Sequence, residues 1–123
     1  MKKNEDSVAN FSREEKPGFI DYRDMVPEFR PYLMFANANN YKKKIVNTDR
    51  LGFRKVYFKK KFYGLDQLKS LNEIDILLGG SVAFGMGSDS DKTSIQSFLS
   101  KDRLCHSLGI RGGVGHQELL AFL

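Results

Sequence analysis

The chain has 123 residues, among them one cysteine, three prolines and no tryptophan. A single cysteine cannot form an internal disulfide, so a disulfide framework is excluded, and we expect Cys105 to be a small buried residue of a strand. No apolar run approaches the roughly 20 residues that cross a bilayer. The two lysines at the amino terminus are not followed by the apolar segment of a signal peptide. These absences predict a cytoplasmic protein with no membrane span.

Composition indicates one small globular domain, since 41% of the residues are hydrophobic. The net charge of +5 is concentrated at residues 42–44 and 54–61. In residues 54–63, aromatic and basic side chains alternate, which is compatible with a non-catalytic binding module for nucleic acid or an anionic glycan. The alternative is a solvated strand pair with its lysines pointing outward. No known nucleic-acid motif accompanies the charges, so we favour the strand pair and expect no nucleic-acid partner.

Three segments follow one another along the chain. Residues 1–17 are polar and predict a mobile tail. Residues 18–72 predict an extension that begins with an irregular, aromatic-rich part. Strand-like pieces and a short helical stretch at 65–71 then follow. Residues 73–123 predict two strand–helix units, the start of a parallel α/β fold.

The two units have matching signals. Residues 74–78 and 104–110 predict buried strands, each followed by a glycine-rich loop. Thr93 and Gln96 fit a capping box that starts the first helix. The predicted helices carry apolar stripes, at Ile95, Phe98 and Leu99 in the first and at Val114, Leu119, Leu120 and Leu123 in the second.

The first glycine loop, GGSVAFGMG at 79–87, carries the strongest chemical signal. It does not fit the spacing of a dinucleotide fingerprint. As a phosphate loop, it has Met86 and Gly87 where lysine and serine or threonine are required. We therefore expect no cofactor and no metal. The remaining interpretations are that Ser81 is a nucleophile on a strand-to-helix turn or simply a turn residue.

The order of the blocks resembles the amino-terminal part of SGNH (GDSL-type) hydrolases. Ser81 and its glycines resemble the family's first block, and residues 93–101 the helix after it. Residues 108–112 and 117–119 resemble the second block and its helix. Upstream, residues 47–49 and 52–54 resemble the lead-in of a branch thought to act on acylated sugars and lipids. The resemblance spans about residues 20–123.

The resemblance implies the start of a three-layer α/β/α, flavodoxin-like fold and a serine ester hydrolase. Ser81 would then be the nucleophile and an oxyanion donor through its N–H. Gly112 would be a second donor, with Gly113 as a register alternative. Ser107 stands where many relatives carry asparagine and receives no role. The partner would be a small-molecule, glycan or lipid ester, and the oligomeric state stays open.

Two parts of the family's machinery are missing from the printed sequence. No asparagine follows Ser81, and no Asp-x-x-His occurs. Asp102 and His106 are four residues apart at the entry to the second strand, and we expect them to be structural. We expect His116 to be an ordinary residue at a helix start. The chain ends inside an apolar helix stripe, which favours the first portion of a larger hydrolase, inactive by itself.

Overall fold

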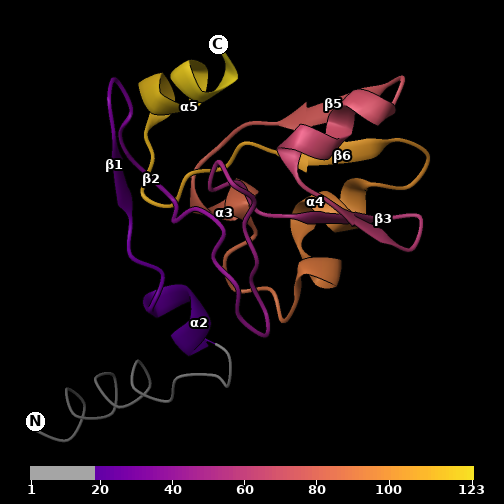
Figure 1. Cartoon of the computed structure of the whole chain (residues 1–123), viewed down its shortest axis with the longest axis horizontal. Helices are drawn as coiled ribbons and strands as arrows, with labels where there is room; N and C mark the ends of the chain where they lie inside the picture. The colour runs from indigo at the N-terminus through magenta and orange to yellow at the C-terminus, as the bar shows by residue number, and fades with distance from the viewer. Residues whose placement is uncertain (1–18) are drawn as a thin grey trace, which may run out of the picture.

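Residues 19–123, which the computed structural model describes, form a small mixed α/β domain (Figure 1). Their strands make three two-stranded sheets. Two are antiparallel hairpins, β1 (Glu28–Arg30) with β2 (Met34–Ala36) and β3 (Val56–Phe58) with β4 (Lys61–Tyr63). The third is a parallel pair, β5 (Ile74–Leu77) with β6 (Leu104–Ser107). The predicted tail at 1–17 lies outside the described residues.

The parallel pair confirms that both predicted segments of the carboxyl-terminal half form strands. The pair runs in register from Ile74 opposite Leu104 to Leu77 opposite Ser107. The prediction that both are buried is wrong for β5, whose residues are half-buried or exposed because one side of this two-stranded sheet is left open. All four residues of β6 are buried, as predicted for this strand, although two of them are the polar His106 and Ser107. β6 ends at Ser107, before the predicted end at Ile110, because the chain then turns into the second glycine loop.

Helices follow each strand of the pair in the predicted order. After β5 come α3 (Ser81–Phe84), the 3-10 turn η2 (Asp91–Thr93) and α4 (Ile95–Leu99). After β6 comes α5 (Gly115–Phe122). A connection through helices of this kind is what joins neighbouring parallel strands. A further 3-10 helix, η1 (Leu65–Ser70), confirms the helical stretch predicted before β5.

The aromatic-rich segment is more regular than predicted. It contains the short helix α2 (Phe19–Arg23) and the β1–β2 hairpin. Tyr22 is buried, as expected, but the rings of Phe29 and Tyr32 are 80% and 90% exposed. The expectation that all these rings pack on a neighbouring surface is therefore wrong for the hairpin, whose β1 and β2 pair with each other and leave these rings in solvent.

The start of α4 differs from the prediction. Ser90, not a residue at the helix start, forms a capping box with Thr93 around η2. Ser94 is the N-cap of α4, and its hydroxyl donates to the Asp91 carbonyl at 2.8 Å. The N-cap of α4 is therefore one residue later than predicted, and Thr93 is the last residue of η2 instead.

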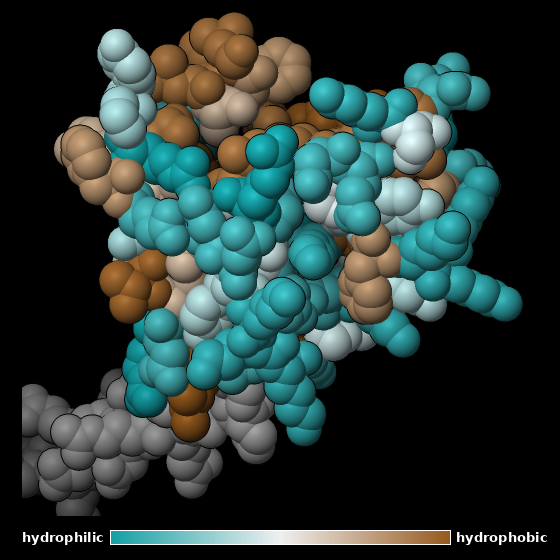
Figure 2. All heavy atoms as spheres, viewed as in Figure 1, coloured by the Kyte–Doolittle hydropathy of each residue, from teal (hydrophilic) through white to brown (hydrophobic). Residues whose placement is uncertain are grey.

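The predicted apolar stripes of α4 and α5 point away from the packed interior. Phe98 on α4 is 70% exposed, and Leu119 on α5 is 55% exposed. The buried helix residues are Gln96 and Ser97 on α4 and Gln117 on α5. Apolar side chains consequently gather on the surface over α5, at the top of the molecule (Figure 2). Sequence periodicity located the apolar faces of these helices correctly, but in the structure these faces are exposed.

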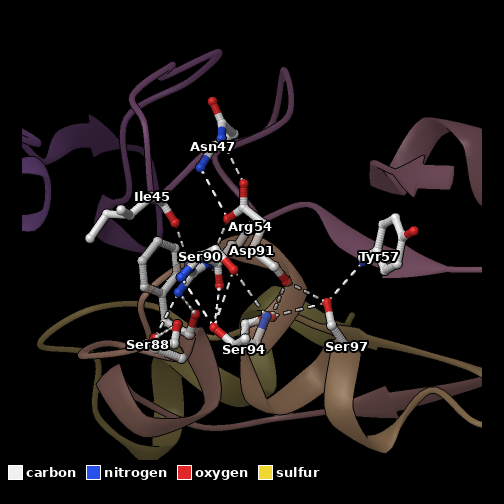
Figure 3. Close-up of polar contacts among 12 residues, drawn as sticks. Ile45, Asn47, Arg54, Tyr57, Ser88, Ser90, Asp91, Ser94 and Ser97 are labelled. Atoms are coloured by element: carbon white, nitrogen blue, oxygen red, sulfur yellow. Dashed lines mark hydrogen bonds and ion pairs between the residues drawn. The ribbon is translucent and has the colours of Figure 1, made fainter. Parts of the chain in front are cut away.

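A buried polar network explains why α4 turns its polar face inward. Its centre is Arg54, which is fully buried and was predicted as part of a basic surface segment. Asp91 accepts from the Arg54 guanidinium, and its own carbonyl accepts from Ser97 at 2.6 Å (Figure 3). Ser97 in turn accepts from the Tyr57 N–H at 2.8 Å. These bonds attach η2 and α4 to β3 through polar contacts.

Apolar contacts form two clusters beside this network. One contains Tyr22, Met25, Val46 and Phe84, which joins the amino-terminal segment to α3. The other contains Val56, Phe58, Leu68 and Leu104, which joins the β3–β4 hairpin to the parallel pair. No helix within residues 19–123 is long and apolar enough to cross a membrane.

Candidate active site

Ser81 stands at the carboxyl end of β5, on the first turn of α3. The strand ends at Leu77, and Gly79 then adopts a φ of +153°, which a residue with a side chain rarely takes. A Cβ on Gly79 would also lie 2.8 Å from the Cβ of Ala83. Gly80 is the N-cap of α3, so Ser81 is its first helical residue. The glycines therefore permit the sharp turn that delivers the half-buried Ser81 to the edge of the sheet.

The second glycine loop lies directly against the first. The Ile110 N–H donates to the Gly79 carbonyl at 3.2 Å, continuing the parallel ladder beyond both strands. A Cβ on Gly80 would lie 3.5 Å from the Gly113 carbonyl oxygen, so the two loops approach as backbones. The carboxyl ends of neighbouring parallel strands are where ligands bind in α/β sheets.

The N–H groups of Ser81 and Gly112 are two of the free backbone donors in these loops. Within residues 19–123, neither N–H is engaged in a hydrogen bond. Gly113, the register alternative, donates its N–H to the Ile110 carbonyl at 3.0 Å and closes a turn. Gly112 has a φ of +71° within that turn. The turn therefore leaves the N–H of Gly112 open and uses that of Gly113.

Ser107 is a structural bridge between the two loops. Its hydroxyl donates to the Ala83 carbonyl at 2.5 Å and accepts from the Gly109 N–H at 3.0 Å. Gly109 itself touches α3, because a Cβ there would lie 2.3 Å from the Phe84 nitrogen. Ser107 therefore contributes a buried hydroxyl that fixes α3 against the second loop.

Asn37, from the loop after β2, holds the second glycine loop from the other side. Its amide nitrogen donates to the Gly109 carbonyl at 2.9 Å, and its amide oxygen accepts from the Arg111 N–H at 3.0 Å. Arg111 also donates to the carbonyls of Tyr22 and Met25. Asn37 is 2% exposed, so these bonds are shielded from water. Sequence reasoning missed this clamp, because Asn37 lies in the segment predicted to be irregular.

Neither histidine contacts Ser81 within the described residues. His106 is fully buried on β6, and neither of its ring nitrogens has a hydrogen-bond partner there. Burial lowers the pKa of His106, although Asp49 and the Ser107 backbone oppose that shift. His116 is exposed on α5. Asp102 is exposed in the loop before β6, so it forms no acid–base pair with the buried ring of His106.

A carboxylate does approach the loop that carries Ser81. The Oε1 atom of Glu118, on the first turn of α5, lies 4.0 Å from the position of a Cβ on Gly80. Glu118 belongs to residues 117–119, for which the sequence indicated only a resemblance to the helix of the second block. The position of Glu118 could have indicated its place, because the first helical turn after the second loop starts at the edge of the sheet.

A mostly apolar pocket of about 170 Å³ lies next to the second loop, between the β1–β2 hairpin and α5. Its apolar lining consists of Leu33, Ala36, Leu51, Phe53, Ile110, Leu120 and Ala121. Ser81 does not line it, but Ile110 belongs to both the pocket and the loop against Gly80. Among residues 19–123, no cluster of three potential metal ligands occurs.

Comparison with known proteins does not assign the chain to a family. A scan against protein-family models and a search of curated proteins gave no match. The chemistry of the site therefore has to be argued from Ser81, its two glycine loops and the groups around them.

Proposed function

We propose that the chain carries the nucleophile of a serine ester hydrolase of the SGNH type, within a flavodoxin-like α/β/α arrangement. The supporting observation is the contact between the two glycine loops at the carboxyl ends of β5 and β6. The N–H groups of Ser81 and Gly112, one on each loop, have no hydrogen-bond partner in the described chain. Such groups are the usual donors to a developing oxyanion.

In this proposal the Oγ of Ser81 attacks the ester carbonyl carbon. The carbonyl oxygen gains negative charge and accepts from the N–H groups of Ser81 and Gly112. The alcohol leaves, and water then releases the acyl group from Ser81. Loss of one oxyanion donor typically slows such a step about a hundred- to a thousandfold. The substrates we propose are acylated sugars or lipids.

The proton of the Ser81 hydroxyl needs an acceptor. Glu118 is the described carboxylate next to this loop, and a carboxylate is a weaker base than the histidine of an SGNH site. The printed sequence has no Asp-x-x-His and no asparagine after Ser81. We therefore expect Ser81 to react slowly in this chain and turnover to be feeble.

A fluorophosphonate probe tests the nucleophile directly, because it reacts once and needs no turnover. The chain should gain one phosphonyl group by intact mass, and peptide mapping should place it on Ser81. Ser81→Ala should abolish the adduct, while Ser70→Ala, an exposed serine outside the site, should leave it unchanged. Equal labelling of Ser81→Ala and the parent chain would refute the proposal. Matching melting curves would show that both variants are folded.

A further inference from the structure

The β1–β2 hairpin lies beside α5 (Figure 1), and the pocket between them has a mostly apolar lining that includes one charged side chain. Within the described residues, that side chain is Arg30, and no aspartate or glutamate lines the pocket. Ligand sites commonly combine an apolar lining with a few polar groups that fix the orientation of the ligand. A cation among apolar side chains therefore favours a ligand with an anionic head and an apolar body.

The guanidinium of Arg30 is held at one wall of this pocket through a single nitrogen. Its Nη2 atom donates to the side-chain oxygen of Asn39 and to the Leu51 carbonyl at 3.4 Å, and Leu51 itself lines the pocket. Within residues 19–123, the Nε and Nη1 atoms of Arg30 have no hydrogen-bond acceptor. The N–H groups on these two nitrogens therefore remain available to an anionic ligand.

Glu28 is the carboxylate that competes for this cation. Its Oε1 atom accepts from the Asn39 N–H at 2.9 Å, and its Oε2 atom lies 3.6 Å from Nη2 of Arg30. That separation is too long for a hydrogen bond, and the Glu28 side chain is 42% exposed, so water screens the pair. Glu28 therefore offsets the charge of Arg30 only weakly.

The wall at the tip of the hairpin has an uncommon backbone conformation. Tyr32 and Met34, on either side of Leu33, both have a φ of +67°, which residues with a side chain seldom adopt. The buried Gln117 on α5 donates to the Leu33 carbonyl at 2.5 Å. This bond holds the hairpin tip against α5, so the wall of the pocket is formed without a ligand. Strained backbone of this kind tends to occur at ligand sites.

We propose that this pocket binds a small monocarboxylate with about six carbon atoms, such as hexanoate. The carboxylate accepts from Nη1 of Arg30, and the alkyl chain lies among Leu33, Ile110 and Leu120. The pocket volume of about 170 Å³ sets the size of the ligand, since a cavity of about 150 Å³ accommodates benzene. Inorganic phosphate, sulfate and sugars would leave the apolar lining uncovered, and an alcohol would leave the cation without an anion.

This inference goes beyond the proposed hydrolysis and does not depend on the reactivity of Ser81. Ester hydrolysis releases a carboxylic acid, which is the same class of compound, but binding to the pocket is measured at equilibrium and without turnover. A failure of fluorophosphonate labelling would therefore refute the nucleophile and leave the pocket assignment intact. A failure of carboxylate binding would do the reverse.

Nuclear magnetic resonance titration of the ¹⁵N-labelled whole chain tests the proposal with acetate, butanoate, hexanoate and hexanol at constant pH and ionic strength. Affinity should rise about fourfold per methylene group from acetate to hexanoate, because each group leaves water for the apolar lining. Hexanol should bind about tenfold more weakly than hexanoate, because it lacks the charge that Arg30 binds. Equal affinities for acetate and hexanoate, or for hexanol and hexanoate, would overturn the proposal.

Charge variants test the role of Arg30. Arg30→Gln should weaken hexanoate binding by about tenfold. Arg50→Gln is the matched control, because Arg50 is exposed and does not line this pocket, and it should leave the affinity unchanged. Glu28→Gln should strengthen binding, because it removes the competing carboxylate and keeps the oxygen that accepts from Asn39. Equal losses in Arg30→Gln and Arg50→Gln would contradict the assignment.

Ala121→Leu tests the apolar lining separately. The larger side chain occupies part of the pocket, so hexanoate should bind more weakly while acetate, which depends on Arg30, binds as before. A melting curve that matches the parent would show that the variant is folded. An unchanged ratio of hexanoate to acetate affinity would contradict the proposed position of the alkyl chain.

Discussion

The Nε atom of Arg54 lies 2.7 Å from Oδ1 of Asp91, and the two side chains are 0% and 5% exposed. The other Arg54 nitrogens donate to the Tyr22 hydroxyl at 3.0 Å and to the carbonyls of Gly85 and Ile45. One guanidinium therefore ties the amino-terminal segment to the loop that follows Ser81. A buried ion pair is costly to form, but this one is surrounded by further hydrogen bonds.

Arg54→Ala should destabilise the chain severely. It leaves the Asp91 carboxylate buried without its cation, a loss that typically amounts to about 3–5 kcal/mol. Arg50→Ala is the control, because its pair with Asp66 spans 3.7 Å and is largely exposed. We expect the control to change the free energy of unfolding by less than about 1 kcal/mol. Urea unfolding of both variants measures the difference, and comparable losses would contradict the central role of Arg54.

Gly109→Ala should disturb the contact between the second loop and α3. The added methyl would lie 2.3 Å from the Phe84 nitrogen, which is backbone and cannot swing aside. We expect a loss of at least about 2 kcal/mol in the free energy of unfolding. Gly115→Ala provides the comparison, since nothing lies within 4 Å of a Cβ there. If Gly109→Ala and Gly115→Ala melted at the same temperature, the prediction would be contradicted, because the second loop would have moved to accommodate the methyl group.

His106 should make the chain sensitive to acid. Burial lowers its pKa in the folded state, so below the usual value of about 6.5 the unfolded chain binds a proton first. Stability contributed by the neutral ring is thus complete above that pH and falls as the pH drops, by up to about 1.4 kcal/mol per unit. Urea unfolding from pH 7.5 to 5 checks this. His106→Leu should show a flatter dependence, and parallel curves would contradict the assignment.

Cys105 should react slowly with thiol reagents in the folded chain. It is free and 7% exposed, and burial, together with Asp75, raises its pKa. Because the thiolate is the reactive form, we expect labelling by an aromatic disulfide at pH 8 to be at least about tenfold slower than in urea. A Cys105→Ser/Ser70→Cys variant, with its thiol at an exposed position, should label rapidly in both conditions. Fast labelling of the folded parent would indicate frequent local opening.

Local signals predicted β5, β6 and the position of Ser81 well. The predicted segments located both strands, although only β6 is buried, and Gly79 and Gly80 mark the turn that places Ser81 at the start of α3. These features depend on residues close together in the chain. Sequence pattern was sufficient because no distant partner decides them.

The orientation of α4 and the clamp around the second loop could not be predicted in this way. A helical stripe such as Ile95, Phe98 and Leu99 shows which face is apolar, not which face packs. Here the polar face of α4 packs inward, because its serines form hydrogen bonds around the buried pair of Arg54 and Asp91. The sequence predicted Arg54 in a surface segment, because it belongs to a run of charged residues. Interactions over long sequence separations leave no local pattern to detect.

The two hydrogen bonds of Asn37 have a consequence for the order in which the molecule assembles. Asn37 is 72 and 74 residues away from its partners Gly109 and Arg111. Contacts over such separations form late, because a long loop must close before they stabilise anything. During synthesis, the edge that carries Gly112 cannot acquire its shape until the ribosome has made both Gly109 and Arg111. The turn at Ser81 depends only on neighbouring residues, so it can form before the second glycine loop acquires its shape.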